Sequence, residues 1–355
     1  MLRVTALPAQ DGDCLWLEWP DQDGATHRML VDGGRGRPAV LAERLGRQPM
    51  TEREFDLVVC THIDADHIGG LLALVADPPA GFRARDVWFN GRDHIDVLGH
   101  VQGDQLSDGL RRSAGPWNGA FGGRAVVVPR DGALPVVELP GLRITLLSPG
   151  RAELATLARG WPQVLEEVDA DLASRRTSAD TLAGRRPDRT VGLHLLARRP
   201  FEPDESPANA SSIAFVAEHH DGGRVLLAAD ASAEVLTAGL RRLGTGQYRV
   251  DLCKVAHHGS RHNTSPELLE LIDCQDWLVS TSGARFGHPS REAMGRILCR
   301  PADRATAWFN YLSPTTEEYA DPALQGRFGF RGVHPPADRP GITLAVGAGR
   351  VELDR

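Results

Sequence analysis

Four short apolar runs in this sequence each end in an aspartate or a histidine, at Asp32, His62, Asp230 and His257. Runs of this kind, rich in Val and Leu and bounded by Gly, Asp or Pro, are typical of buried β-strands. Buried strands bring their ends to one edge of a sheet, and loops at such an edge commonly build active sites. We therefore expect these four side chains to lie close together.

The second run leads into a short polar segment that reads HIDADH and holds His62, Asp64, Asp66 and His67. Alternate residues of an extended loop point the same way, so His62, Asp64 and Asp66 can converge. Crowded carboxylates repel one another and raise each other's pKa unless a cation neutralises them. Divalent metals prefer this set of oxygen and nitrogen donors, so the segment predicts a metal site. The alternative is an exposed acidic turn, which the later Asp230 and HHGS segments argue against.

The remaining pattern is a series of short strands and amphipathic helices. Strands are predicted over 2–7, 13–19, 28–32, 56–62, 86–90, 124–129, 142–149, 211–220, 223–230, 251–258, 277–282, 304–310, 341–346 and 350–353. Helices are predicted over 38–47, 68–76, 153–176, 231–244, 265–272 and 290–298. Gly69 and Gly70 would let the start of the second helix approach a neighbouring strand closely. Two strand-rich halves that each carry helices predict paired sheets with helices on both outer faces.

Composition narrows the class of protein. The 355 residues can bury a large core without disulfides. There are 40 Lys and Arg against 47 Asp and Glu, and this net charge of −7 excludes a nucleic-acid coat protein, although a local basic patch is compatible with it. Five scattered cysteines favour a reducing compartment and argue against a thiolate metal site. Without a signal-peptide pattern or an apolar run of membrane length, we expect a cytoplasmic protein that does not contact a membrane.

An arginine-rich stretch interrupts the strand pattern. Residues 175–200 hold seven arginines and two aspartates. One interpretation is a solvated surface loop, because charge runs usually face water. The other is a flap that binds an anionic substrate, with contacts from Arg175, Arg176, Arg185, Arg186 and Arg189.

Several segments together resemble one known family. The segment THIDADHIGG resembles the first metal motif of the metallo-β-lactamase-fold hydrolases, and RVLLAAD resembles the strand that carries their bridging aspartate. DLCKVAHHGS with FGHPS, DGDCLWLEW and NASSIAFVAEH are similar to the nuclease-like (ComEC-type) domain of bacterial DNA-uptake proteins. The resemblance implies an α/β fold, an αββα sandwich of two mixed β-sheets flanked by helices. It implies one domain over residues 1–355, with an insertion at about 150–207.

The resemblance also implies a site for two divalent ions, which are zinc or manganese, with magnesium as an alternative. The implied ligands are His62, Asp64, Asp66, His67, Asp230 and one or both of His257 and His258. Asp32 resembles the aspartate that orients a ligand without binding metal, although a plain turn residue is an equal alternative. Asp64 stands where the family has histidine, and another expected histidine has no clear counterpart. His94, His100, His194 and His219 are candidates, and a structural role is the simpler interpretation of each.

In such a site two metals hold a hydroxide that attacks phosphorus or a carbonyl carbon. Asp66 is predicted to be catalytic because it is an implied ligand of one of these metals. His288 is the predicted proton donor for the leaving oxygen, and a loop histidine next to a helix is the alternative. Asn209, Lys254 and Ser260 are predicted to position substrate oxygens.

Three functions fit these patterns. The first is a phosphodiesterase, in particular a nuclease acting on DNA or RNA. The second is a small-molecule hydrolase that acts on an ester, a lactone or a phosphocholine-type group. The third is a metal-binding subunit that depends on a protein partner, in an anti-phage defence system. The HHGS and GHP resemblance and the arginine-rich stretch favour the first, and the net negative charge keeps the second open.

Overall fold

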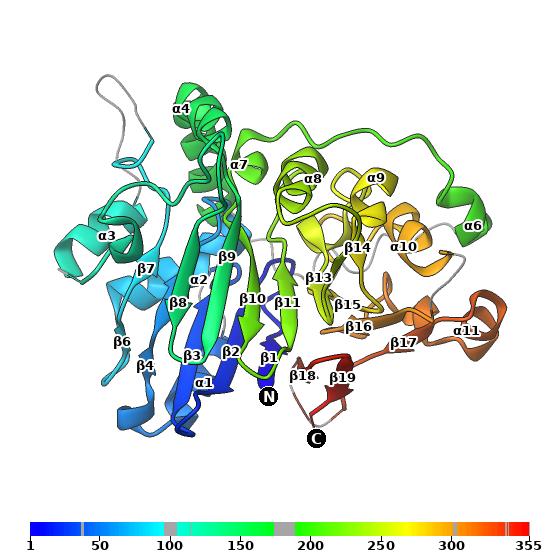
Figure 1. Ribbon diagram of the computed structural model, residues 1–355, viewed down its shortest axis with the longest axis horizontal. Coiled ribbons are helices and arrows are strands. Elements are labelled where there is room, and N and C mark those ends of the chain that lie inside the picture. The colour runs from blue at the N-terminus through cyan, green and yellow to red at the C-terminus, as the bar shows by residue number, and fades with distance from the viewer. Residues whose placement is uncertain are drawn as a thin grey trace.

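The computed structural model describes residues 1–36, 39–95, 105–113, 115–173, 189–300, 304–337, 339 and 341–354. Within these residues the chain forms two large β-sheets (Figure 1). The first sheet has the strand order β19-β18-β1-β2-β3-β5-β7. Its strands are β1 (Leu2–Ala6), β2 (Leu15–Pro20), β3 (Thr26–Val31), β5 (Leu57–Val59), β7 (Val87–Trp88), β18 (Ile342–Gly347) and β19 (Arg350–Leu353).

The second sheet has the order β17-β16-β15-β13-β11-β10-β9-β8. Its strands are β8 (Val136–Leu139), β9 (Leu142–Ser148), β10 (Ala214–His219), β11 (Arg224–Leu227), β13 (Leu252–Lys254), β15 (Asp276–Val279), β16 (Thr306–Phe309) and β17 (Arg331–Val333). Strands β8 to β11 pair antiparallel, whereas β11 to β17 pair parallel, so the sheet is mixed. Two small ribbons join β4 (Glu54–Phe55) to β6 (Arg83–Ala84) and β12 (Tyr248–Arg249) to β14 (Ile272–Asp273).

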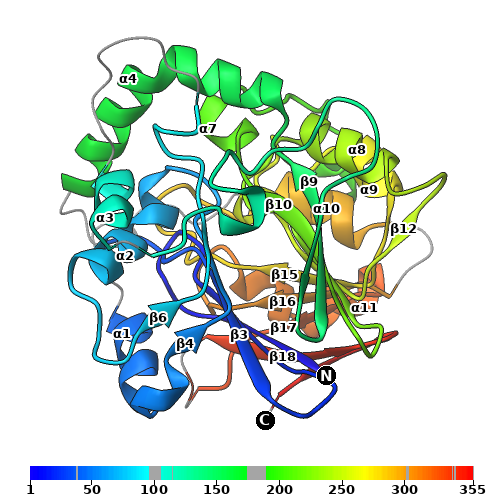
Figure 2. The ribbon, with the colours of Figure 1, turned by 60° about the vertical axis from the view of Figure 1, so that its left-hand side comes forward.

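Helices cover the outer sides of the paired sheets, and Figure 2 shows α1 to α3 on one side and α8 to α10 on the other. The α-helices are α1 (Ala39–Arg47), α2 (Ala65–Ala76), α3 (Gln105–Ser113), α4 (Arg151–Ala173), α6 (Leu193–Leu196), α7 (Pro207–Ala210), α8 (Ala233–Arg241), α9 (Pro266–Glu270), α10 (Arg291–Leu298) and α11 (Pro322–Phe328). Short 3-10 turns are η1 (Met50–Glu52), η2 (Gly119–Phe121), η3 (Ala256–Gly259) and η4 (Glu317–Ala320). The predicted α/β sandwich of two mixed sheets flanked by helices is confirmed.

The alternation of side chains along β2 explains why the sheet is covered on both faces. Leu15, Leu17 and Trp19 belong to the core between the two sheets, whereas Trp16 belongs to the core beneath α1 and α2. Successive residues of a strand point to opposite faces, so a strand with large apolar residues on both faces is buried on both sides.

One predicted strand is wrong. Residues 124–129 are apolar, yet they form only an isolated bridge between Val128 and Gly150. The Asn90 side chain accepts a hydrogen bond from the Val126 amide and donates one to the Val126 carbonyl, each at 2.8 Å. A buried side chain therefore provides backbone hydrogen bonds that a neighbouring strand would otherwise make.

The predicted insertion contributes the long helix α4, which confirms the helical pattern as far as Ala173. Arg175, Arg176, Arg185 and Arg186 lie outside the described residues. No helix in the described ranges is both long and apolar enough to cross a membrane.

Candidate metal centre

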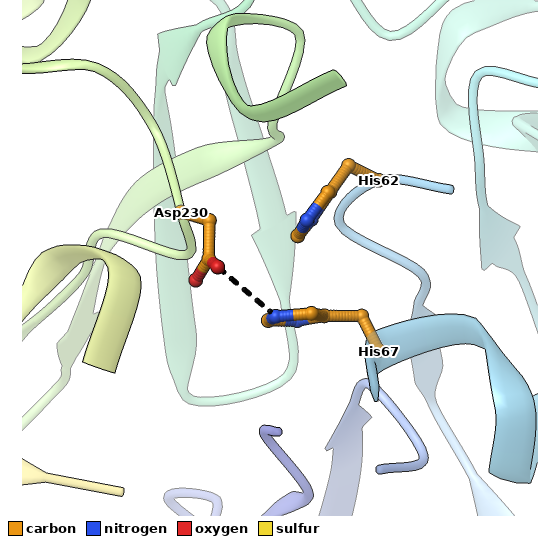
Figure 3. A group of neighbouring side chains, drawn as sticks. All are labelled: His62, His67 and Asp230. Atoms are coloured by element: carbon orange, nitrogen blue, oxygen red, sulfur yellow. Dashed lines mark ion pairs between the residues drawn. The ribbon is translucent and has the colours of Figure 1, made fainter. Parts of the chain in front are cut away.

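The ends of four strands meet at one edge of the two sheets, as the sequence predicts. Asp32 follows β3 and His62 follows β5, and these two strands pair parallel. Asp230 follows β11 and His257 follows β13, which also pair parallel. Figure 3 shows that His62, His67 and Asp230 converge from the β5 loop, the start of α2 and the β11 loop.

The start of α2 reaches this point because glycines allow a close approach. Gly70 donates its amide to the Gly34 carbonyl at 2.9 Å, and Gly33 donates to the His67 carbonyl at 2.8 Å. A Cβ atom on Gly70 would lie 2.0 Å from the Gly33 oxygen, so a side chain there would push the helix away. The predicted role of the glycine pair is confirmed.

The buried donor atoms are spaced as ligands of a common ion would be. Asp230 Oδ2 lies 3.3 Å from both His67 Nε2 and His258 Nε2, and Asp66 Oδ2 lies 3.6 Å from His258 Nε2. Two ligands about 2.1 Å from one tetrahedral ion lie about 3.4 Å apart. These donors therefore fit a divalent metal without rearrangement of the side chains.

The two imidazoles are held so that their Nε2 atoms face the same space. His67 Nδ1 donates to Asp32 Oδ2, and His258 Nδ1 donates to the Ser280 carbonyl, each at 2.8 Å. The two Nε2 atoms lie 3.2 Å apart. Metal-binding histidines are normally fixed by a hydrogen bond on the other ring nitrogen, which leaves the inner nitrogen as the ligand. Asp32 thus has the geometry of the orienting aspartate that the resemblance implies.

Two buried atoms of the centre have no hydrogen-bond partner among the described residues, His62 Nε2 and Asp230 Oδ1. A buried polar atom without a partner costs about 1–3 kcal/mol, and bound cations remove that cost. Asp64, whose side chain is one-third exposed, places Oδ2 3.5 Å from His62 Nε2, which is again a ligand spacing. The unpaired atoms and the spacing together support a fit to metal ions.

His257 and His258 both face Asp230, and which of them binds a metal stays a prediction. His257 Nε2 lies 3.7 Å from Asp230 Oδ2, and its Nδ1 donates to Asp204 at 3.1 Å and to Asn263 at 2.9 Å. Consecutive residues of a strand would point to opposite faces. Here both histidines adopt the left-handed conformation, with φ of 46° and 54°. This backbone turns both rings toward one carboxylate.

Electrostatics keep the carboxylates of the centre ionised. Burial raises the pKa of Asp66, but the hydrogen bond to His258 and the charge of His67 outweigh it and hold that pKa far below its ordinary value. Burial lowers the pKa of His67, whereas Asp230 and Asp32 outweigh burial and raise that pKa well above its ordinary value. Without metal, protons on the imidazoles balance the carboxylates. Metal binding should therefore release protons.

Beneath the centre lies a buried ion pair that sequence analysis did not find. The Lys254 ammonium contacts the Asp13 carboxylate, lies 3.7 Å from Asp230 Oδ1, and donates to the Ala229 carbonyl at 3.2 Å. Asp13 Oδ1 lies 3.5 Å from His258 Nδ1. Burial raises the pKa of Asp13, but Lys254 and His258 outweigh it and lower that pKa to about 2. The pair therefore fixes one side of Asp230 and of His258.

A family model described as the Metallo-beta-lactamase superfamily matches residues 11–129, which include β2, β3, β5 and the HIDADH segment. The two mixed sheets flanked by helices are consistent with a metallo-β-lactamase-like fold.

The solved structures that are similar to this chain are distant from it in sequence and give low TM-scores. The HARLDQ-motif mutant S60 of the metallo-β-lactamase from Cronobacter sakazakii is 13% identical, with 68% of this chain and 70% of that chain covered and a TM-score of 0.30. A diphosphatase of the PhnP family is 12% identical over 97% of this chain and 98% of that chain, with a TM-score of 0.37. Long-form RNase Z from yeast is 9% identical over 100% of this chain and 49% of that chain, with a TM-score of 0.37. No curated protein matches the sequence.

Three residues that are predicted to contact substrate lie buried around the candidate centre. Lys254 is fully buried, as described above. Asn209 is buried and donates to Asp204 at 2.7 Å, and buried Ser260 accepts from the His262 amide at 3.1 Å. These side chains hold other groups of the site in place, and their predicted contact with substrate oxygens stays a prediction. Exposed Arg189 pairs with Glu317 at 2.9 Å.

His288 lies beside the centre, with its ring centroid 5.3 Å from that of His257. Burial, followed by the charges of His257 and His258, lowers the pKa of His288 to about 3. The ring is therefore neutral at pH 7 and can donate only through one N–H group. Its role as proton donor stays a prediction.

The candidates for an additional histidine ligand have other contacts. His94 packs edge-on against Trp117, His194 lies near Phe328, and His219 Nε2 donates to the Pro20 carbonyl at 2.8 Å. His100 lies outside the described residues.

A buried arginine that sequence analysis missed stands at the rim of the centre. Arg35 donates to Asp11 at 2.8 Å and to Asp171 of α4 at 2.7 Å, and its Nη2 lies 3.9 Å from Asp66 Oδ1. The other oxygen of Asp171 contacts Arg285. One carboxylate is therefore held between two guanidinium groups next to a predicted ligand. The sequence gives no periodic signal for this contact, because the three segments are far apart in the chain.

Proposed function

We propose that the protein is a metal-dependent phosphodiesterase and that its substrate is a nucleic acid, DNA or RNA. The observation that carries the proposal is the arrangement of Arg35 and Arg285 around the Asp171 carboxylate, beside Asp66. The two oxygens of a carboxylate resemble the two non-bridging oxygens of a phosphodiester, and arginine donors match both groups. A neutral ester or lactone would gain nothing from two guanidinium groups at this place.

The residues that would hold the divalent ions are His62, Asp64, Asp66, His67, Asp230, His257 and His258. When bound, such ions supply Lewis acidity and a nucleophilic water at neutral pH. Asp32, Ser280 and Asp204 fix the orientation of the histidines through their outer nitrogens.

The other groups act on the substrate itself. Once the Asp171 carboxylate moves away, Arg35 and Arg285 would bind the non-bridging oxygens of the substrate. They would thereby align the phosphorus with the centre. The sequence predicts His288 as proton donor to the leaving oxygen; as a neutral ring it would instead stabilise that oxygen with a hydrogen bond from its one N–H, and the proton would come from water. Burial of the centre strengthens each of these contacts, because the effective dielectric constant is lower away from water.

The test is hydrolysis by purified protein supplied with Mn²⁺, Mg²⁺ or Zn²⁺. Substrates are single- and double-stranded DNA and RNA, bis(p-nitrophenyl) phosphate, a phosphocholine ester and a lactone. Cleavage of the phosphodiesters that is lost in Asp230→Ala supports the proposal. Turnover of the lactone or the phosphocholine ester with no cleavage of nucleic acid would instead favour the small-molecule hydrolase. No turnover until a protein partner is added would favour the partner-dependent subunit.

A further inference from the structure

An exposed aromatic ring lies next to the candidate proton donor. Phe286 is 50% exposed, and its ring centroid lies 6.1 Å from that of His288. Among the described residues, Phe286 is the only aromatic residue whose large hydrophobic side chain is exposed. The other exposed large hydrophobic side chains are those of Met1, Met50, Val136, Leu195 and Leu312. Single exposed apolar residues are common on proteins, so the exposure of Phe286 alone does not indicate a binding site.

A pocket lies beside the Phe286 ring. It has a volume of about 420 Å³, and its lining includes Phe286, His288, Arg261, His262 and Arg199. The volume falls within the range of small-ligand sites. Because His288 belongs both to the pocket lining and to the surroundings of His257, the pocket adjoins the metal centre.

The charged residues around the pocket favour an anionic ligand. Arg261 is exposed, its Nε donates to His262 Nε2 at 3.0 Å, and no carboxylate pairs with it within the described ranges. Arg199 is already paired with Glu292 at 2.8 Å. Arg285 lies 5.2 Å from the Phe286 ring centroid, so a cation already occupies the neighbourhood of this aromatic face. A cationic headgroup such as choline would meet repulsion here, whereas an anionic chain that carries aromatic bases would not.

We propose that this pocket is a nucleotide subsite for single-stranded nucleic acid, with a base stacked on Phe286 and a backbone phosphate bound by Arg261. This inference rests on the proposed function and specifies its substrate. A single strand is required because the bases of a duplex are stacked on each other and leave no free face for the ring. Stacking combined with a nearby cation is the common mode of binding to single strands.

The experiment measures binding by fluorescence anisotropy in EDTA, so that cleavage does not contribute. The probes are a labelled oligothymidine and an oligomer of equal length and charge that is abasic throughout. Phe286→Ala should weaken binding of the oligothymidine by about 5- to 150-fold, the loss expected for one stacked base, and leave the abasic oligomer unchanged. Phe286→Trp should retain binding.

Arg261→Gln should weaken both probes and reduce the log–log salt dependence by about 0.7, the value for one phosphate contact on a single strand. Val136→Ala is the matched control, since Val136 is similarly exposed (47%) but lies on β8. It should change neither probe. Equal losses for both probes in Phe286→Ala, or no loss in either, would overturn the subsite, as would competition by phosphocholine that depends on Phe286. If the wild-type protein binds the strand as expected but cleaves nothing with any metal, the proposed function fails while the subsite stands.

Discussion

Replacement of Lys254 by methionine should destabilise the protein strongly, because it leaves carboxylates buried without their counter-charge. Lys254 and Asp13 are 0% and 1% exposed, so water cannot compensate. The attraction between Lys254 and Asp230 at 3.7 Å is about 4–5 kcal/mol at an effective dielectric constant of 20. Removal of one partner of a buried pair typically costs about 3–5 kcal/mol. We therefore expect Lys254→Met to lower the free energy of unfolding by about 3–5 kcal/mol.

Urea denaturation of the metal-free protein, followed by circular dichroism, measures this loss. The double variant Asp13→Asn with Lys254→Met also removes the Asp13 charge and should recover the part of the loss that comes from Asp13, whereas the part that comes from Asp230 remains. Arg241→Gln provides a control, because its ion pair with Glu267 is exposed and should contribute less than about 1 kcal/mol. A loss below about 1 kcal/mol in Lys254→Met, or no recovery in the double variant, would refute the interpretation of the buried pair.

Three further predictions concern the ligands of the candidate metal centre and, outside it, His27. Asp66→Ala and Asp230→Ala should each abolish hydrolysis and reduce bound metal, as elemental analysis after reconstitution would measure; near-wild-type turnover in either would exclude that ligand. Asp64→His should shift the metal preference toward zinc, because nitrogen replaces harder oxygen, and an unchanged profile across Mn²⁺, Mg²⁺ and Zn²⁺ would place Asp64 outside the metal's ligands. Burial lowers the pKa of His27, but hydrogen bonds to Asp56 and Asp21 outweigh it and raise that pKa above its ordinary 6.5. Protonated His27 therefore contributes its whole stabilisation below about pH 6.5, and this stabilisation is lost as the pH rises through the raised pKa. In thermal denaturation, the melting temperature of His27→Gln should differ most from that of the wild type at acidic pH.

The parts of the fold that were predicted correctly are those with a local signal. Apolar runs that end in polar residues located β3, β5, β11 and β13, and parallel pairing then brought their ends together. The strand predicted over 124–129 failed for a reason that no local pattern contains. The Val126 amide and carbonyl form hydrogen bonds with the Asn90 side chain, and the apolar pattern of a buried strand and of a buried irregular segment is the same.

The supporting groups of the site could not be predicted because their meaning depends on distant partners. Asp13 stands in a turn-like DGD segment, where a plain turn residue is the ordinary interpretation. Only the fold brings it to Lys254 and His258. Arg35 follows two glycines and gives no pattern of its own, yet it reaches Asp171 on α4 and the rim of the centre. Long-range ion pairs of this kind leave no periodicity in the sequence.

The backbone of η3 explains why two consecutive histidines face the same carboxylate. In a regular strand successive residues alternate between faces, so only one of His257 and His258 would face the site. Non-glycine residues in the left-handed conformation are strained by about 1–2 kcal/mol each, so two in succession persist only if their surroundings hold them. Here the His257 amide donates to the Ala229 carbonyl at 2.9 Å, and the outer nitrogens of both rings are held by the contacts described above. The strained turn therefore places both imidazoles next to the Asp230 carboxylate.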